Sequence, residues 1–257
     1  MARHFNTPVR GVFVANPGYV LGAAGVPRGA VISNFNGQPV ADLAAFEQIV
    51  AKLPDGGRAA VRFTTLDDPK GSDTRVLRMD RSWFPARHCR RDDATGLWPC
   101  TDLPPPPAAT PTPPAGTTFA KTGDARADAI APSLVHVTFD MPMSVAGITE
   151  RNYHGTGLLI DAERGLVVVD RNTVPVAPGD VRLTFAGSIE IPGRVEYIHP
   201  LHNVAIVSFD PKLLDGTPIR APKFDTRELT AGEPVTVVGL GGDARLRSLA
   251  TTVSTVD

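Results

Sequence analysis

Residues 155–174 read Gly-Thr-Gly-Leu-Leu-Ile-Asp-Ala-Glu-Arg-Gly-Leu-Val-Val-Val-Asp-Arg-Asn-Thr-Val. Two short apolar runs, at 157–161 and 165–170, flank a polar turn, and this pattern predicts two antiparallel strands. Similar runs recur through the C-terminal half, with candidate strands at 134–139, 181–185, 189–198, 204–209, 234–240 and near 249–256. Closing a sheet removes the exposed edges that such short strands would otherwise present, so the spacing predicts a closed antiparallel barrel in an all-β domain at 121–257.

A proline-rich stretch precedes this β region. Residues 103–116 contain seven prolines in fourteen positions, which removes backbone donors and favours polyproline II. We interpret 103–120 as a semi-rigid spacer between two domains. The alternative is a proline-rich ligand for an SH3-like partner.

The N-terminal part combines strands with one amphipathic helix. Apolar strand patterns lie at 11–15, 29–35, 59–64 and 74–79, separated by turns rich in glycine, asparagine and proline. Asp42 can cap a helix that ends before the Pro-Asp-Gly-Gly stop at 54–57, and its apolar residues recur at three- and four-residue spacing. We therefore predict an α+β domain at 1–84 and a cysteine-containing extension at 85–102.

The overall charge argues against nucleic acid as a partner. The 257 residues carry 26 Lys+Arg and 27 Asp+Glu, a net charge of -1. A neutral chain lacks the attraction to phosphate that drives non-specific binding to nucleic acid. The longest apolar runs have the length of strands, which predicts no membrane span, and the first residues lack the apolar core of a secretion signal.

Several segments in the N-terminal part resemble a PDZ domain of the HtrA serine-protease type. They are Gly11-Val12-Phe13-Val14, residues 24–32, residues 36–43 and Leu53-Pro54-Asp55-Gly56. The resemblance implies that a ligand C-terminus adds as a strand beside the helix at 42–53, with Leu43, Phe46, Glu47 and Val50 lining the groove. In that family the groove strand precedes the strand at 11–15, so here it is expected to be missing or supplied by a degenerate segment at 3–9.

The second resemblance is to the six-stranded N-terminal barrel of a trypsin-like protease, again of the HtrA kind. Residues 155–161 and 165–174 resemble the glycine-rich strand pair that leads to the catalytic histidine, and Asn172 stands at that position. The segment His202-Asn203-Val204-Ala205-Ile206-Val207 resembles the strand of the catalytic aspartate, where this chain has Asn203. Residues 235–242 and 248–256 resemble the close of this barrel, and the segment of the nucleophilic serine would follow residue 257.

These residue types predict a domain without proteolytic activity. An amide can neither accept the proton of a serine hydroxyl nor stabilise an imidazolium ion, and no Gly-x-Ser-x-Gly, Ser-x-x-Lys or His-Glu-x-x-His motif occurs in the chain. The order of the domains resembles the inactive second half of double-length HtrA-like proteins. We therefore expect a non-catalytic module that binds protein or peptide C-termini, associates with an active HtrA-like protease, or self-associates. The alternatives are a fragment of an active serine endopeptidase whose catalytic half is supplied by another chain or gene, and a gene product without function.

Two cysteines complete the list of candidate sites. Cys89 and Cys100 enclose a turn-prone loop, and a disulfide between them is sterically plausible in an oxidising compartment. The resemblance to HtrA proteins suggests the bacterial periplasm for such a chain. Two thiols in a reducing compartment remain the alternative. Neither His88 beside the cysteines nor the set His154, His199 and His202 has the spacing of a metal site, so we expect neither a metal nor a cofactor.

Overall fold

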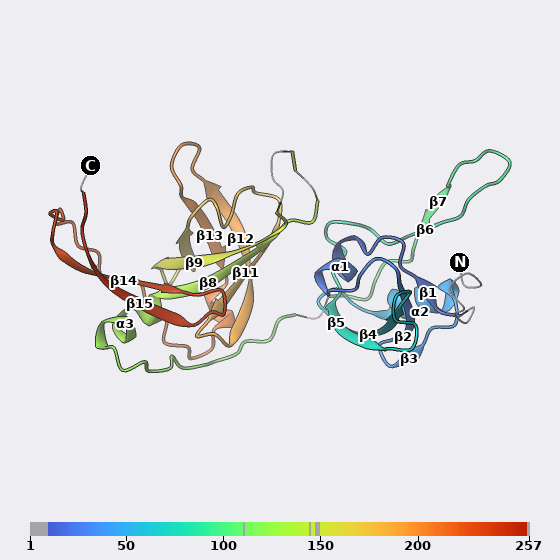
Figure 1. Cartoon of the computed structure of the whole chain (residues 1–257), viewed down its shortest axis with the longest axis horizontal. Helices are drawn as coiled ribbons and strands as arrows, with labels where there is room; N and C mark the ends of the chain where they lie inside the picture. Colours follow the sequence, from blue (N-terminus) through green and yellow to red (C-terminus); the bar gives the residue numbers. More distant parts are fainter. Residues whose placement is uncertain (1–9, 110, 144, 147–149, 256–257) are drawn as a thin grey trace. The chain divides into compact units, whose positions relative to one another are not determined.

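The computed structural model describes residues 10–109, 111–143, 145–146 and 150–255. The chain divides into two compact units, residues 1–111 and 112–257, each with its own hydrophobic core (Figure 1). The division falls inside the proline-rich stretch, and the finer domain boundaries stay predictions. No helix among the described residues has the length and hydrophobicity that crossing a membrane requires.

The first unit is an antiparallel sheet with two short helices, as the α+β prediction states. The sheet has the strand order β1-β2-β4-β5, and β3 pairs with β2. Its core is formed by side chains such as Ile32, Phe35, Val61 and Phe63, all at most 1% exposed. The elements are β1 (Val12–Phe13), α1 (Gly18–Ala23), β2 (Ala30–Phe35), β3 (Gln38–Pro39), α2 (Leu43–Lys52), β4 (Arg58–Thr65) and β5 (Asp73–Arg78).

Helix α2 forms where the apolar spacing predicts it. Asp42 precedes the helix, and its Oδ1 accepts a hydrogen bond from the backbone N–H of Ala45 at 2.9 Å, the arrangement of an N-cap. Ile49 is buried against the sheet. Helix α1, by contrast, is absent from the prediction, because it has only six residues, two of them glycine, and no side-chain cap.

The cysteine-containing extension is a small hairpin. Strands β6 (Arg87–Cys89) and β7 (Cys100–Asp102) pair antiparallel, with Cys89 directly opposite Cys100. The two cysteines form a disulfide across this pair. The hairpin loop between them is therefore closed covalently as well as by backbone hydrogen bonds.

The second unit contains the predicted closed, six-stranded antiparallel barrel, with neighbours in the order β10-β13-β12-β11-β8-β9. Glycines allow this closure. A Cβ atom on Gly157 would lie 2.5 Å from Val167 Cγ1 and 2.8 Å from Val137 Cγ2, so the interior has no room for a side chain there. The barrel strands are β8 (Leu134–Asp140), β9 (Asn152–Asp161), β10 (Leu166–Val169), β11 (Asp180–Phe185), β12 (Ile189–Ile198) and β13 (Ala205–Phe209).

Short helical turns flank the barrel strands. Helix α3 (Ala125–Ile130) and the 3₁₀ turn η1 (Ala131–Ser133) lead into β8, and a second 3₁₀ turn, η2 (Pro211–Leu213), follows β13. The end of the proline-rich stretch is attached to this unit, since the backbone N–H of Ala115 donates to the carbonyl of Leu213 at 3.0 Å.

The last two strands lie outside the barrel. β14 (Pro234–Leu240) and β15 (Leu246–Thr252) form a separate two-stranded sheet, so the prediction that they close the barrel is wrong. The six preceding strands already close on themselves and leave no edge for a seventh. The hairpin contacts the barrel through Thr156, whose Oγ1 accepts from the N–H of Leu240 at 2.8 Å and donates to its carbonyl at 3.2 Å.

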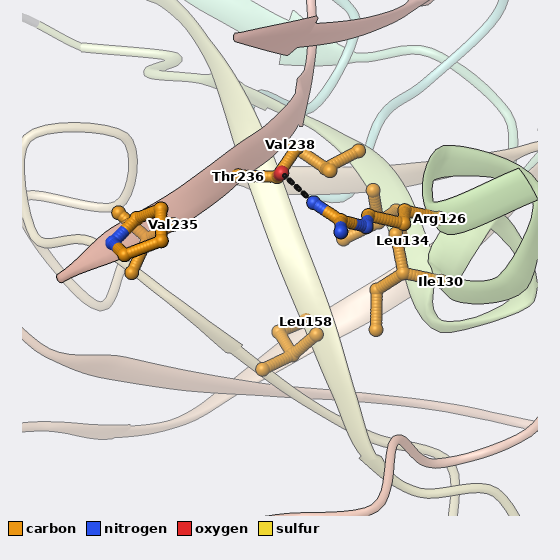
Figure 2. Close-up of a pocket in the computed structure, with 8 residues that line it drawn as sticks. Arg126, Ile130, Leu134, Leu158, Val235, Thr236 and Val238 are labelled. Carbon is orange, nitrogen blue, oxygen red and sulfur yellow. Dashed lines mark hydrogen bonds between the residues drawn. The ribbon is translucent and has the colours of Figure 1, made fainter. Parts of the chain in front are cut away.

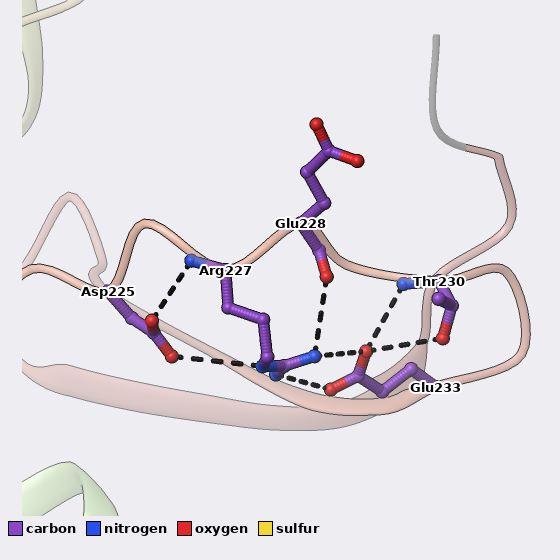
Figure 3. Close-up of polar contacts among 5 residues, drawn as sticks. All are labelled: Asp225, Arg227, Glu228, Thr230 and Glu233. Carbon is purple, nitrogen blue, oxygen red and sulfur yellow. Dashed lines mark hydrogen bonds and ion pairs between the residues drawn. The ribbon is translucent and has the colours of Figure 1, made fainter.

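The loop that enters β14 is held by an arginine–carboxylate pair (Figure 3). Arg227 Nη1 and Nη2 donate to the two carboxylate oxygens of Glu233 at 2.9 and 2.6 Å. The backbone N–H of Thr230 donates to the same carboxylate at 3.2 Å. The bonds from Arg227, followed by that from Thr230, lower the pKa of Glu233 to about 2.

Candidate functional site

The outer face of α2 is the first place where predicted site residues meet. Leu43 is 47% exposed at the start of the helix. Phe46 packs edge-to-face on Phe35 of β2, with ring centroids 5.2 Å apart, and Val50 packs against the core. Of the apolar side chains predicted to line a groove, Leu43 is therefore available to a ligand, while Phe46 and Val50 also anchor the helix.

Two residues that were not among the predicted peptide-binding residues contact α2. His88 of the disulfide hairpin places Nδ1 2.6 Å from Glu47 Oε1, so Glu47 is engaged within the unit. Arg81 donates from Nη2 to the carbonyl of Val50 at 2.7 Å and from Nη1 to that of Leu53 at 3.1 Å, which satisfies free carbonyls at the helix end. No sequence pattern links residues 88 and 47, which lie 41 positions apart. The segment at 3–9, predicted as a substitute groove strand, lies outside the described residues.

Predicted site residues also meet at one end of the barrel, where Asn172 and Asn203 lie. Strands β10 and β13 pair with Val169 opposite Ala205, so the residues after β10 and those before β13 run side by side. The backbone N–H of Arg171 donates to Asn203 Oδ1 at 2.8 Å. The two positions identified by resemblance therefore belong to one continuous surface, and Asn172 is exposed on it.

Arg171 fixes the loop that carries Asn203. Its Nη1 donates to the carbonyls of His199 and Pro200 at 2.9 and 3.0 Å. His199 Nδ1 in turn accepts the N–H groups of Leu201 and His202, at 3.1 and 2.9 Å. These two bonds engage Nδ1 of His199 as an acceptor within its own loop. Arg171 was not predicted as a site residue, although it directly precedes Asn172.

Hydrogen bonds also hold the turn that carries Asn172. Asp170 accepts from Thr173 twice, from the backbone N–H at 3.0 Å and from Oγ1 at 2.7 Å. Thr173 is buried and packs against Gly155, where a Cβ atom would lie 2.1 Å from Thr173 Oγ1. Asn172 and Asn203 thus contribute amides to this surface and Arg171 a guanidinium group, and groups of these kinds can hydrogen-bond a ligand.

The set His154, His199 and His202, considered as metal ligands, is divided between two places. His154 stacks on His136 with ring centroids 5.8 Å apart, while His199 and His202 lie 4.5 Å apart in the loop before β13. Within the part of the chain that the structure describes, no group of three or more histidine, cysteine or acidic side chains could hold a metal ion.

Comparisons with known proteins agree with both resemblances. A family model described as a PDZ-like domain matches residues 1–56. A PDZ domain-containing protein of Schizosaccharomyces pombe is 34% identical over 260 residues, which cover 100% of this chain and 26% of that protein. The pro-apoptotic serine protease NMA111 of Pyricularia oryzae is 34% identical over 99% of this chain and 25% of its own length. That of Yarrowia lipolytica is 34% identical over 100% of this chain and 27% of its own length. The chain thus spans about a quarter of the length of these relatives.

Proposed function

We propose that the chain is a non-catalytic, peptide-binding module of the HtrA type; the PDZ-like family match and the relatives named as PDZ domain-containing and as serine proteases support the type. In this proposal the first unit captures protein or peptide C-termini. The barrel acts as a scaffold, either for association with an active HtrA-like protease or for self-association.

The observation that carries the proposal is the hydrogen bond from the Arg171 N–H to Asn203 Oδ1, beside Asn172. In the trypsin-like arrangement that the sequence resembles, these two positions hold the general base and the acid that orients it. Amides there leave a serine hydroxyl without a group to accept its proton. Losing one member of such a triad typically slows catalysis by a factor of about 10⁴ or more.

The binding half of the proposal rests on the α2 face. Leu43 is exposed at its N-terminal end, and Phe46 and Val50 continue an apolar stripe along the helix. An extended peptide beside such a helix would place alternate side chains on this stripe, which is how strand addition obtains its specificity. Glu47, held by His88, would set the polarity at the edge of the stripe.

Peptide titration tests the binding half. We expect the chain to bind some members of a library of peptides with free C-termini and to lose affinity for the amidated versions. Leu43→Glu should weaken binding about tenfold or more by introducing a charge where an apolar side chain is expected to sit. An acidic residue in the first helical turn also suits the helix dipole, so the variant should stay folded. The matched control is Ala44→Glu, an exposed position in the same turn. A flat response across the library, or equal effects of the two variants, would contradict peptide capture by α2.

The competing proposal is that the chain belongs to an active serine endopeptidase. It is favoured by the names of the relatives, which are serine proteases, and by the fact that this chain spans only about a quarter of their length. A fluorophosphonate probe and a casein assay distinguish the two proposals when the chain is tested alone and then together with a full-length relative. The non-catalytic proposal requires no labelling and no cleavage by the chain alone. It also requires that Asn172→Ala and Asn203→Ala leave cleavage in the mixture unchanged.

A further inference from the structure

The outer face of β4 and β5 carries arginines on both strands. Successive residues of a strand point to opposite faces of the sheet. Ala59, Val61 and Leu77 point into the core of the first unit and are at most 2% exposed. The outer face therefore carries their neighbours along the two strands, which are all exposed: Arg58, Ala60 and Arg62 on β4, and Thr74, Val76 and Arg78 on β5.

The pairing of the two strands arranges these side chains in rows. The register gives three cross-strand pairs, Arg58 with Arg78, Ala60 with Val76, and Arg62 with Thr74. Successive rows lie about 6.6 Å apart, because each is two residues further along the strand. An apolar row thus lies between two positively charged rows, and Val76 in that apolar row is 63% exposed.

The positive charge of this face is not compensated by the described part of the chain. There, neither an ion pair nor a side-chain hydrogen bond involves the guanidinium group of Arg58, Arg62 or Arg78. The acidic residues at the two ends of β5 are engaged elsewhere. Asp73 Oδ1 lies 3.6 Å from Arg75 Nη1, and Asp80 Oδ1 accepts the backbone N–H of Ser82 at 2.8 Å.

The pair Arg58–Arg78 is unfavourable as it stands. Other arginines of the chain have a partner, as Arg126 does at the pocket in Figure 2, where its Nη1 donates to Thr236 Oγ1 at 3.2 Å. Arg58 and Arg78 instead lie directly opposite each other, and like charges in such a position destabilise a sheet. A carboxylate between the two guanidinium groups would replace this repulsion by charge-assisted hydrogen bonds.

The pattern of the face suits a peptide better than a nucleic acid. Nucleic-acid binding gains its affinity from many phosphate contacts, whereas this face offers few arginines, on a chain of net charge -1. Alternate side chains of an extended peptide lie on one face of the peptide and repeat every 6.6 Å or so, which is the spacing of the rows. An acidic, an apolar and a second acidic side chain of such a peptide can therefore meet the three rows in turn.

We propose that an extended acidic segment of a partner protein docks on the outer face of β4 and β5, with acidic, aliphatic and acidic side chains at i, i+2 and i+4. One carboxylate lies between Arg58 and Arg78, the aliphatic side chain covers Val76, and the other carboxylate binds Arg62. Helix α2 packs on the inner face of the same sheet through Ile49. This surface is therefore separate from the peptide site proposed on α2 and does not depend on it.

The test uses the whole chain and a fluorescent, N-acetylated and C-amidated peptide, Glu-Thr-Val-Thr-Glu, followed by fluorescence anisotropy. We expect saturable binding that weakens about tenfold or more when Arg58→Gln and Arg78→Gln are combined, because charge-assisted hydrogen bonds are lost. Arg164→Gln, at an exposed arginine in the β9–β10 turn, is the matched control. Leu43→Glu should leave this binding unchanged, which separates it from the proposed α2 site.

The stability of the free chain gives a second readout. Combining Arg58→Gln and Arg78→Gln removes a like-charge pair, so the midpoint of tryptophan-detected urea unfolding should stay the same or rise. A lower midpoint would overturn the view that this pair is unfavourable without a ligand. An unchanged or higher midpoint together with weaker binding shows that the variant is folded and that the arginines act on the peptide.

Two further conditions test the geometry and the charge of the site. The rearranged peptide Glu-Glu-Val-Thr-Thr has the same composition and charge, but its second carboxylate cannot reach the row of Arg62, so it should bind several-fold more weakly. Raising the salt concentration from about 0.1 M to about 1 M should also weaken binding, because the Debye length falls from about 10 to about 3 Å.

Several results would overturn the proposal. They are no binding of Glu-Thr-Val-Thr-Glu, equal binding by the double variant and by Arg164→Gln, equal binding of the rearranged peptide, and binding that salt does not affect. A short double-stranded DNA serves as the competing ligand. If it binds more tightly than the peptide and is weakened by the same double variant, nucleic acid is the occupant of this face and the proposal is wrong.

Discussion

Replacing His136 by leucine should change how the stability of the barrel depends on pH. His136 on β8 is 8% exposed, and its Nε2 has no hydrogen-bond partner in the described part of the chain. Burial, followed by the nearby charge of His154, lowers the pKa of His136 below the ordinary 6.5, while Asp243 and Glu190 oppose this shift. The folded barrel therefore holds this imidazole neutral at pH values where the unfolded chain protonates it.

The direction of the effect follows from proton linkage. Above about pH 6.5 both states are neutral, and His136 adds no pH dependence. As the pH falls below that value, the unfolded state binds the extra proton first, so the free energy of unfolding decreases with falling pH. One proton accounts for at most about 1.4 kcal/mol per pH unit. His136→Leu should remove this slope. At neutral pH the substitution should also raise the free energy of unfolding by up to about 1–3 kcal/mol, because it removes a buried polar atom that has no hydrogen-bond partner.

Urea unfolding from about pH 8 to about pH 5 provides the measurement. Both tryptophans of the chain, Trp83 and Trp98, lie in the first unit, so their fluorescence follows that unit and serves as an internal control. Far-UV circular dichroism also reports the barrel. His154→Gln should keep most of the slope, because burial is the larger cause of the shift. An unchanged slope in His136→Leu would refute the assignment of the pH dependence to this imidazole.

Three further predictions concern stability and titration. Gly157→Ala should destabilise the barrel by about 1–3 kcal/mol in urea, because its Cβ atom would lie 2.5 Å from Val167 Cγ1; Gly239→Ala, with 3.4 Å to its nearest neighbour, should be close to neutral. Arg81→Met should destabilise the first unit by about 1.5–3 kcal/mol in tryptophan-detected unfolding, because Arg81 binds the carbonyls at the end of α2 and its side chain is 11% exposed. The control is Arg78→Met, at an exposed arginine, and an equal loss of stability in that variant would contradict the role of Arg81. In an NMR titration Glu233 should have a pKa of about 2 in the chain and a higher one in Arg227→Gln; an unchanged midpoint would mean that the pair with Arg227 does not set it.

Much of the fold follows from local patterns in the sequence. Each of the six barrel strands contains a predicted apolar run, although β9 begins at Asn152, before its run at 157–161, and α2 begins directly after its aspartate cap. The sheet to which a strand belongs is not a local property. The segments around β14 and β15 read as strands, but only the closed pairing of β8–β13 shows that they form a separate hairpin.

The candidate sites were partly predictable. Asn172 and Asn203 were identified by resemblance, and the pairing of β10 with β13 brings their segments together. The contacts of His88 with Glu47 and of Arg81 with the end of α2 join residues 28–41 positions apart and leave no periodic signal.

Closure of the barrel has a consequence for how the second unit opens to solvent. A ring of six paired strands has no terminal strand at which the ladder can begin to fray, so its amides should take up deuterium together, when the unit unfolds as a whole. The hairpin β14–β15 lies outside this ring and is joined to it by few hydrogen bonds, so its amides should become labelled much earlier. The barrel and the hairpin would then exchange their amide protons at different rates because their strands are paired differently, although both are built from β-strands.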